Sequence, residues 1–186
     1  MRQTDNPHSQ IRLRLPDVDD ATILWRLARD SDLDLNSPYS YLLLCREFAD
    51  TCLVAEREDT IIGFVTGFRP PSRPEVVFVW QVAVAAAARE CGVGVMLVDE
   101  LVARAIRQGA CYLEATVTPS NEPSRRLFAS VAHRRAAALA ERTLFEAAAF
   151  PGSAHEDEVL LRIGPFDPAE ARAPNVSARV ASGIES

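Results

Sequence analysis

The stretch Val76-Val77-Phe78-Val79-Trp80-Gln81-Val82-Ala83-Val84, followed by Arg89-Glu90-Cys91-Gly92-Val93-Gly94-Val95, decides the fold. Its first nine residues are mostly β-branched or aromatic, which predicts a buried strand. From Met96 to Ile106 apolar residues recur three and four positions apart, with charged residues between them, which predicts an amphipathic helix. Gly109 stands where a glycine commonly ends a helix. The stretch therefore predicts a central strand, a glycine-bearing turn and a helix.

The turn at Gly92 and Gly94 is suited to an anion. The first N–H groups of a helix have no partner within it and carry partial positive charge, and glycines let a diphosphate approach them. Arg89 adds a full positive charge beside them. The same glycines also fit a tight turn that binds nothing, and these residues alone favour neither reading. No Gly-Lys-Ser/Thr of a P-loop follows, and the third glycine of a dinucleotide-binding turn is missing.

Arg89-x-x-Gly92-x-Gly94 between a central strand and a helix resembles the cofactor-binding motif of the GNAT N-acetyltransferases. The resemblance implies that acetyl-CoA is the co-substrate and that its pyrophosphate lies at this turn. It also implies that the strand backbone pairs with the cofactor and polarises its acetyl carbonyl. The cofactor-binding candidates are Val82, Ala83, Val84, Arg89, Gly92, Val93, Gly94, Val95, Asn121, Ser124 and Phe128. Many family members have a tyrosine at Phe128 as an acid for the leaving thiolate, and a phenylalanine cannot donate that proton.

Composition indicates one globular domain. The 186 residues are 48% hydrophobic and 25% charged, and the net charge is −6. This charge argues against nucleic acid or an anionic membrane as a partner and is compatible with a cationic substrate. No apolar run reaches the ~20 residues of a membrane helix, and residues 1–8 lack the apolar core of a signal peptide. We therefore expect a cytoplasmic protein. The four cysteines show no Cys-x-x-Cys spacing, so we expect neither a metal site nor a disulfide framework.

Hydrophobic periodicity places the remaining elements. Strands are expected at 11–15, 51–57, 61–68, 110–117, 133–142 and 159–163, and helices at 17–28, 38–48 and about 121–132. This order is that of a GNAT domain over residues 11–165, an α/β fold with a central mixed sheet flanked by helices. Residues 1–10 and 166–186 are polar or rich in Pro, Ala and Ser, and we expect them to be loose tails.

Three further segments resemble the branch of this family that acetylates L-2,4-diaminobutyrate in ectoine biosynthesis. They are Asp34 to Tyr41, Trp80 to Val84, and Phe150-Pro151 followed by His155 to Leu160. The resemblance implies a small diamino-acid substrate, a homodimer, and substrate contacts from Asp34, Asn36, Ser37, Tyr39, Trp80, Thr116 and Glu158. Read from the residues alone, Trp80 also fits the core, and the acidic segments also fit solvated loops.

Acetylation of an alkylamine requires a proton acceptor. At pH 7 an ammonium with a pKa of ~10.4 is neutral about once in several thousand molecules. Glu114 is the first candidate, as proton acceptor or ammonium anchor, because a carboxylate in a mostly apolar strand is costly to bury without a partner. A carboxylate at an exposed edge, or a structural ion pair, is the alternative. His155 is the second candidate, and no acyl-cysteine is needed, since the amine can attack the thioester directly.

Two other functions stay open at this point. One is a GNAT enzyme for another amine, such as a polyamine or a protein N-terminus. The other is a non-catalytic acyl-CoA-binding domain, which Phe128 favours.

Overall fold

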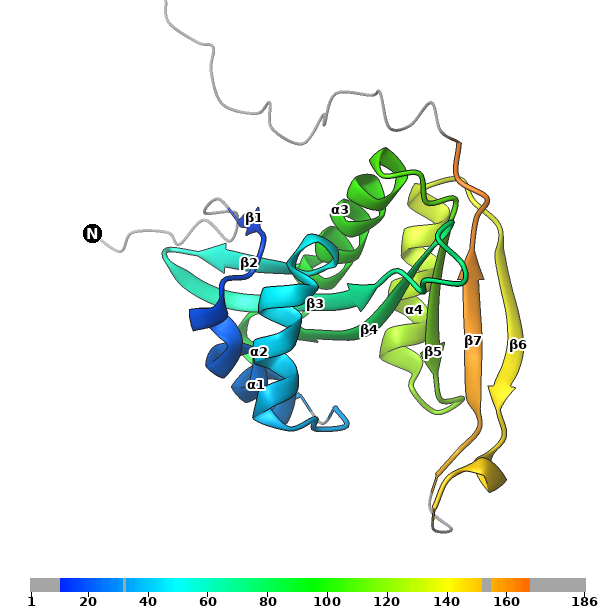
Figure 1. The fold of residues 1–186 in the computed structure, drawn as a ribbon, viewed down its shortest axis with the longest axis horizontal. Coiled ribbons are helices and arrows are strands. Elements are labelled where there is room, and N and C mark those ends of the chain that lie inside the picture. Colours follow the sequence, from blue (N-terminus) through cyan, green and yellow to red (C-terminus); the bar gives the residue numbers. More distant parts are fainter. Residues whose placement is uncertain (1–10, 32, 152–154, 168–186) are drawn as a thin grey trace, which may run out of the picture.

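The computed structural model describes residues 11–31, 33–151 and 155–167. One seven-stranded sheet runs through it in the order β1-β2-β3-β4-β5-β7-β6 (Figure 1). The strands are β1 (Arg12–Arg14), β2 (Leu53–Arg57), β3 (Thr60–Phe68), β4 (Val76–Val84), β5 (Tyr112–Val117), β6 (Leu139–Phe145) and β7 (Glu158–Ile163). The helices are α1 (Ala21–Arg29), α2 (Pro38–Glu47), α3 (Val93–Arg107) and α4 (Glu122–Arg134), with 3-10 turns η1 (Val18–Asp20), η2 (Ala49–Thr51), η3 (Ala86–Ala88) and η4 (Ala147–Ala149).

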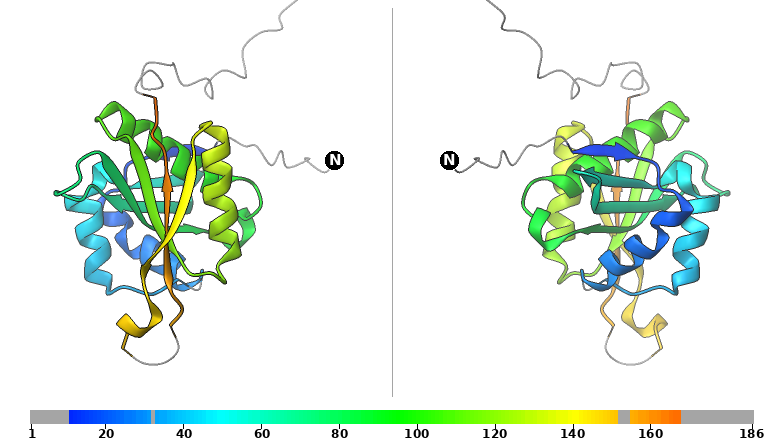
Figure 2. Two further views of the ribbon diagram at one scale, coloured as in Figure 1. Left: turned by 90° about the vertical axis from the view of Figure 1, so that its right-hand side faces the viewer. Right: turned by 90° about the vertical axis from the view of Figure 1, so that its left-hand side faces the viewer.

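The helices cover both faces of the sheet. Helices α1 and α2 pack on one face through a cluster that includes Leu24, Tyr41 and Phe64 (Figure 2). Helices α3 and α4 pack on the other face through a larger cluster that includes Leu97 and Leu113. The mixed sheet and the order of elements confirm the fold predicted from the sequence.

Some boundaries shift by a few residues, since α1 begins at Ala21 after a 3-10 turn and β2 begins at Leu53. Two further differences concern the C-terminal part of the chain. The sixth strand is Leu139–Phe145 and not 133–142, because α4 continues to Arg134. The alanines and long polar side chains of this segment favour a helix, whereas few β-branched residues support a strand. Beyond β7, Phe166 is buried in the α3–α4 core and its N–H donates to the carbonyl of Cys111 over 2.8 Å. The packed part of the chain therefore passes the expected boundary at 165, and the rest of both expected tails lies outside the described residues.

The central strands β4 and β5 separate part-way along their length. They form the parallel pair of the sheet, in which Val76–Val79 lie beside Tyr112–Ala115. Beyond Val79, β4 pairs only with β3, while β5 continues beside β7 to Val117. The inner edges of both strands are therefore open at their carboxyl ends. In an open α/β sheet such a separation is a common place for a ligand.

A β-bulge shapes the open part of β4. The pairing with β3 passes from Gln81 to Val79, so Trp80 is the extra residue. Gly67 lies opposite, and a Cβ there would come within 2.5 Å of the Phe78 carbonyl oxygen. A bulge re-aims neighbouring side chains, and here it lets two consecutive residues, Trp80 and Gln81, both face the opening.

The turn before α3 needs each of its glycines for a different reason. Gly92 has φ +76° and caps the helix in a left-handed conformation, with no atom in the way of a Cβ. Gly94 has ordinary backbone geometry, but a Cβ there would lie 2.8 Å from Leu127 Cδ1 of α4. The close approach of α3 to α4 thus accounts for Gly94 whether or not a ligand lies at the turn.

Candidate active site

Two adjoining cavities occupy the opening between β4 and β5. The first, the polar cavity, has a volume of about 520 Å3. The second, the strand cavity, has a volume of about 580 Å3 and follows the open edge of β4 towards α4. Both are lined by Leu33, Trp80, Gln81, Thr116, Val117 and Asn121. Because they share these residues, a molecule in one cavity can meet a molecule in the other.

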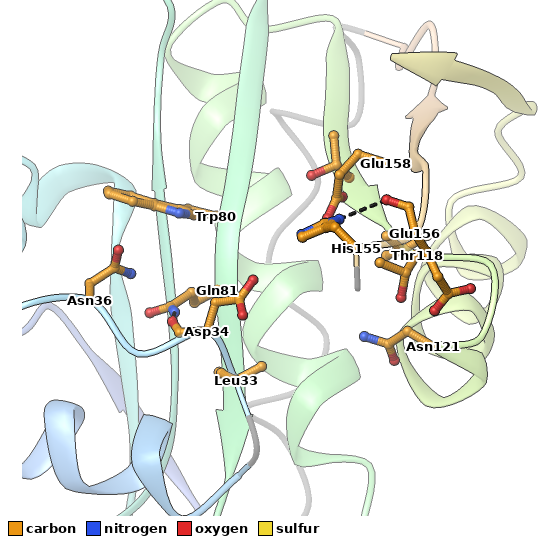
Figure 3. Close-up of a pocket in the computed structure, with 12 residues that line it drawn as sticks. Leu33, Asp34, Asn36, Trp80, Gln81, Thr118, Asn121, His155, Glu156 and Glu158 are labelled. Atoms are coloured by element: carbon orange, nitrogen blue, oxygen red, sulfur yellow. Dashed lines mark hydrogen bonds and ion pairs between the residues drawn. The ribbon is translucent and has the colours of Figure 1, made fainter. Parts of the chain in front are cut away.

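The polar cavity has two facing walls, which Figure 3 shows. Asp34, Asn36, Trp80 and Gln81 form one wall, from the segment before α2 and from the bulge of β4. The other wall is formed by Thr118, Asn121, His155, Glu156 and Glu158, from the turn before α4 and from the segment that leads into β7. Thr116, near the end of β5, also lines the cavity. Trp80 is 47% exposed, so it faces the cavity and is not part of the core.

Two buried polar side chains, Tyr41 and Gln81, hold the Asp34 segment in place through hydrogen bonds. The hydroxyl of Tyr41 on α2 donates to Oε1 of Gln81 over 2.9 Å. The amide Nε2 of Gln81 then donates to the backbone carbonyl of Asp34 over 2.8 Å. Burial raises the pKa of the Tyr41 phenol, so this hydroxyl stays a donor at neutral pH. The wall of the cavity that carries Asp34 is therefore fixed to the central strand.

His155 is held in a defined orientation. Its Nδ1 lies 2.7 Å from the backbone carbonyl oxygen of Glu156. A carbonyl only accepts, so Nδ1 carries the proton and Nε2 keeps its lone pair in the neutral imidazole. Phe150 stacks on the ring, with centroids 3.7 Å apart and an interplanar angle of 4°. The free Nε2 lies 4.0 Å from Oε1 of Glu158, which places a proton acceptor beside an anion.

Glu156 connects the polar cavity with the strand cavity through a hydrogen-bonded contact with Ser120. Its carboxylate accepts from the hydroxyl of Ser120 and, over 3.3 Å, from the Ser120 N–H. Ser120 lines the strand cavity, whereas Glu156 lines the polar cavity. This contact ties the loop that carries His155 to the turn before α4.

The strand cavity is lined by the backbone edge of β4 and by α4. Of the expected cofactor residues, it contains Val82, Ala83, Val84, Arg89, Asn121, Ser124 and Phe128. Arg89 donates through Nε to the carbonyl of Val84 over 3.2 Å, which fixes its side chain beside the strand end. Asn121 caps α4 by accepting from the Ser124 N–H. Val93, Gly94 and Val95 form the first turn of α3 after Gly92, outside the residues that line either cavity.

The structure does not bring Glu114 to the cavities. Its side chain is 1% exposed, Oε2 accepts from Arg73 over 2.5 Å, and Oε1 accepts from Arg162 over 2.7 Å. The Arg162 guanidinium also lies over the Tyr112 ring at 3.8 Å. With both oxygens occupied by cations, this carboxylate is poorly suited to take a proton from a substrate. The ion-pair reading of Glu114 fits this geometry, and the proposed catalytic role does not.

Two expected substrate contacts also point elsewhere. Tyr39 is 64% exposed, and the Ser37 hydroxyl pairs with Ser40 at 3.4 Å on the surface of α2. Both residues follow Asn36, where the chain turns away into the helix. Of the segment expected to contact the substrate, the first part, Asp34 and Asn36, lines the cavity.

Sequence reasoning missed several residues of the site. Gln81, Thr118, Ser120 and Glu156 line the cavities, and Phe150 supports the histidine. The bulge that turns Gln81 inward has no sequence signal, because its cause is the pairing with β3. The neighbouring aromatic and imidazole at 150 and 155 were visible, but only the fold shows them stacked.

Comparison with known proteins agrees with this arrangement. A family model described as the acetyltransferase (GNAT) family matches residues 21–132. The chain belongs to this GNAT family. Among curated GNAT relatives, an L-2,4-diaminobutyric acid acetyltransferase from Marinococcus halophilus is 42% identical over 89% of this chain and 96% of its own length. Another from Streptomyces anulatus is 51% identical over 81% of this chain and 88% of its own.

Solved GNAT structures give the same picture. The diaminobutyrate acetyltransferase EctA from Paenibacillus lautus, in complex with its substrate L-2,4-diaminobutyric acid and coenzyme A, is 43% identical with a TM-score of 0.80. The alignment covers 86% of this chain and 97% of that one. Ard1 from Thermoplasma volcanium, at 18% identity and a TM-score of 0.68, shares the fold.

Two features are absent from the described residues of this GNAT domain. No helix in these residues combines the length and the apolar character that crossing a membrane requires. Within the same residues, no three His, Cys, Asp or Glu side chains come together as a metal site would require.

Proposed function

We propose that this protein transfers the acetyl group of acetyl-CoA to the 4-amino group of L-2,4-diaminobutyrate, giving N4-acetyl-L-2,4-diaminobutyrate in ectoine biosynthesis. The observation that carries the proposal is the polar cavity, where carboxylates and an imidazole surround a space continuous with the open edge of β4. The similarity to diaminobutyrate acetyltransferases over most of both chains supports the same substrate.

The strand cavity fits the co-substrate. Backbone groups of Val82 to Val84 have no partner strand on the inner edge of β4, so they can pair with an amide-containing arm. The first N–H groups of α3, with Arg89 nearby, suit the pyrophosphate. When bound, acetyl-CoA supplies an activated acetyl thioester. We propose that an N–H on this open edge of β4, between Val82 and Val84, donates to the negative charge that develops on the acyl oxygen.

We propose that His155 is the proton acceptor and Glu158 the ammonium anchor. The Nε2 lone pair of His155 faces the cavity beside Glu158, so an ammonium held by the carboxylate can pass its proton to the imidazole. Trp80 and Asp34 face them from the opposite wall and are proposed to hold the rest of the substrate. Phe128 lies in the strand cavity and offers no proton to the leaving thiolate, so we propose that the thiolate departs without help from this position.

The test is thiol release from acetyl-CoA with L-2,4-diaminobutyrate, followed by NMR of the product. Acetyl on N4 is the expected result, and acetylation of another amine in preference to this one would contradict the proposal. His155→Ala should lower kcat by at least ~100-fold, the scale of general-base catalysis. His133→Ala is the matched control, because His133 lies exposed in the last turn of α4. Equal losses in both variants would remove His155 from the chemistry.

A homodimer and a cytoplasmic location complete the proposal. Strand β6 ends the sheet, and Ala140 to Thr143 are exposed, so a free edge is available to a second copy. The four cysteines are free thiols, as expected in a reducing compartment. Light scattering on the purified protein tests the homodimer. Fractionation of the source cells tests the cytoplasmic location.

A further inference from the structure

Among the described residues, the polar cavity is lined by several carboxylates and by no arginine. Its lining includes the carboxylates of Asp34, Glu156 and Glu158, and none of the described residues that line it is an arginine. The printed sequence contains no lysine, so all 20 basic residues are arginines. A substrate with two ammonium groups and one carboxylate therefore meets anions for its cations, but no cation for its anion.

Three arginines from segments around β4 and β5 have other partners. Arg73 and Arg162 both bind Glu114. Arg89 belongs to the strand cavity, where its Nε donates to Val84. Arg142 is a further arginine on this side of the sheet. It lies opposite Leu160 of β7, and Leu160 lies opposite Thr116, which lines the cavity. Arg142 itself is exposed and does not line the cavity.

The groups left for a substrate carboxylate are neutral donors. The Asn36 amide and the Thr116 and Thr118 hydroxyls line the cavity. A carboxylate accepts charge-assisted hydrogen bonds from such donors, but it gains no ion pair here, and its removal leaves only neutral donors, which are less costly to leave unpaired than a charged group. The site should therefore recognise the two nitrogen ends of its substrate strongly and the carboxylate weakly.

We propose that this enzyme also acetylates short unsubstituted diamines, with 1,3-diaminopropane as the matching member of that class. This molecule is L-2,4-diaminobutyrate without its carboxylate, so it keeps the three-carbon spacing between nitrogens. The inference rests on the proposed function. In the step, the amine nitrogen forms a bond to the acyl carbon and the carbon–sulfur bond breaks. The amine proton goes to Nε2 of His155, and CoA leaves as the thiolate.

The experiment compares kcat/KM for three acceptors with acetyl-CoA. 1,3-Diaminopropane should lie within about tenfold of L-2,4-diaminobutyrate, because no ion pair is broken and only neutral donors are left without the substrate carboxylate. 4-Aminobutyrate keeps the carboxylate and lacks the second ammonium, so it should fall by at least about a hundredfold, since a carboxylate of the site loses its cation. A loss of more than tenfold with 1,3-diaminopropane, or a rate with 4-aminobutyrate equal to it, would overturn the proposal.

Two variants separate the possible causes. Asp34→Asn should lower kcat/KM for the diamine and the diamino acid alike, because both offer a second ammonium. Arg142→Gln should leave the ratio between these two substrates unchanged. A selective loss with the diamino acid in Arg142→Gln would assign the carboxylate to Arg142 and refute the inference. Failure of the proposed function is distinct, since wild-type enzyme would then not turn over L-2,4-diaminobutyrate at all.

Discussion

Replacement of Glu114 by glutamine distinguishes a structural ion pair from a catalytic base. The side chain is 1% exposed and accepts one hydrogen bond from each of Arg73 and Arg162. Glutamine keeps the shape and one acceptor oxygen, but it removes the charge that both guanidinium groups face. If Glu114 acted as a base, this change would abolish turnover without a large effect on folding.

The magnitude follows from the exposure of the three partners. Hydrogen bonds to charged groups contribute about 1.5–3 kcal/mol each. The two arginine side chains are 41% and 37% exposed, so they can recover water when Glu114 loses its charge. We therefore expect Glu114→Gln to lower the free energy of unfolding by only about 1–2 kcal/mol. Removal of both arginines by Arg73→Met and Arg162→Met is expected to cost more, about 3–5 kcal/mol, because it leaves a buried carboxylate without a cation.

The assay is urea unfolding at pH 7, together with kcat and KM for each variant. Glu122→Gln is the control, because its partner Arg126 and Glu122 itself are 69% and 74% exposed, and a surface pair contributes ~0–1 kcal/mol. Glu114→Gln should keep kcat within about threefold of wild type, since 1.4 kcal/mol of barrier would already be tenfold. A hundredfold fall in kcat at unchanged stability would refute the structural reading.

Three further predictions concern other parts of the chain. Phe150→Ala should lower kcat by up to about tenfold, because loss of a stacking partner worth ~1 kcal/mol frees the His155 ring. Steady-state kinetics should show that Phe150→Tyr restores kcat. A Phe150→Tyr variant as slow as Phe150→Ala would contradict a stacking role. Paired hydrogen bonds from Arg14 hold the pKa of Asp20 below its ordinary value. The resulting stabilisation is present above the unfolded-state pKa of ~3.9 and is lost as the pH falls through the lower folded value. Asp20→Asn should therefore cost about 2 kcal/mol at pH 7, and unfolding curves should show this difference shrinking in acid; a constant difference would argue against the pair. Gly92→Ala should cost about 1 kcal/mol in the same assay, because φ is +76°, and an unchanged midpoint would show that the left-handed conformation is not required.

Local pattern was enough to predict most of the fold. The strand at 76–84 and the helix after Gly92 each depend on neighbouring residues, and each was found at the expected place. The strand expected at 133–142 was misplaced because alanine-rich segments carry little periodicity. Phe166 was missed because one apolar residue in a polar tail has no period at all, and only the packed α3–α4 core shows where it fits.

The site was predictable by segment but not by side chain. Residues from 34, 80, 116, 155 and 158 do line one cavity. Glu114, two positions before Thr116 on the same strand, does not line it, and its partners Arg73 and Arg162 come from distant parts of the chain. A buried carboxylate signals that a partner exists. Whether that partner is a substrate or an arginine is decided by tertiary structure.

The separation of β4 from β5 also bears on how such an enzyme can diversify. The strand cavity, proposed for the thioester donor, is lined mainly by β4, the end of β5 and α4, whereas much of the polar cavity, proposed for the acceptor, comes from two short segments, 33–36 and 155–158, that lie far apart in the sequence. Substitutions in these segments alter which amine is accepted and leave the strand cavity in place. After gene duplication, a few substitutions in these segments can therefore change the acceptor amine of one copy, while both copies still use the same acyl donor.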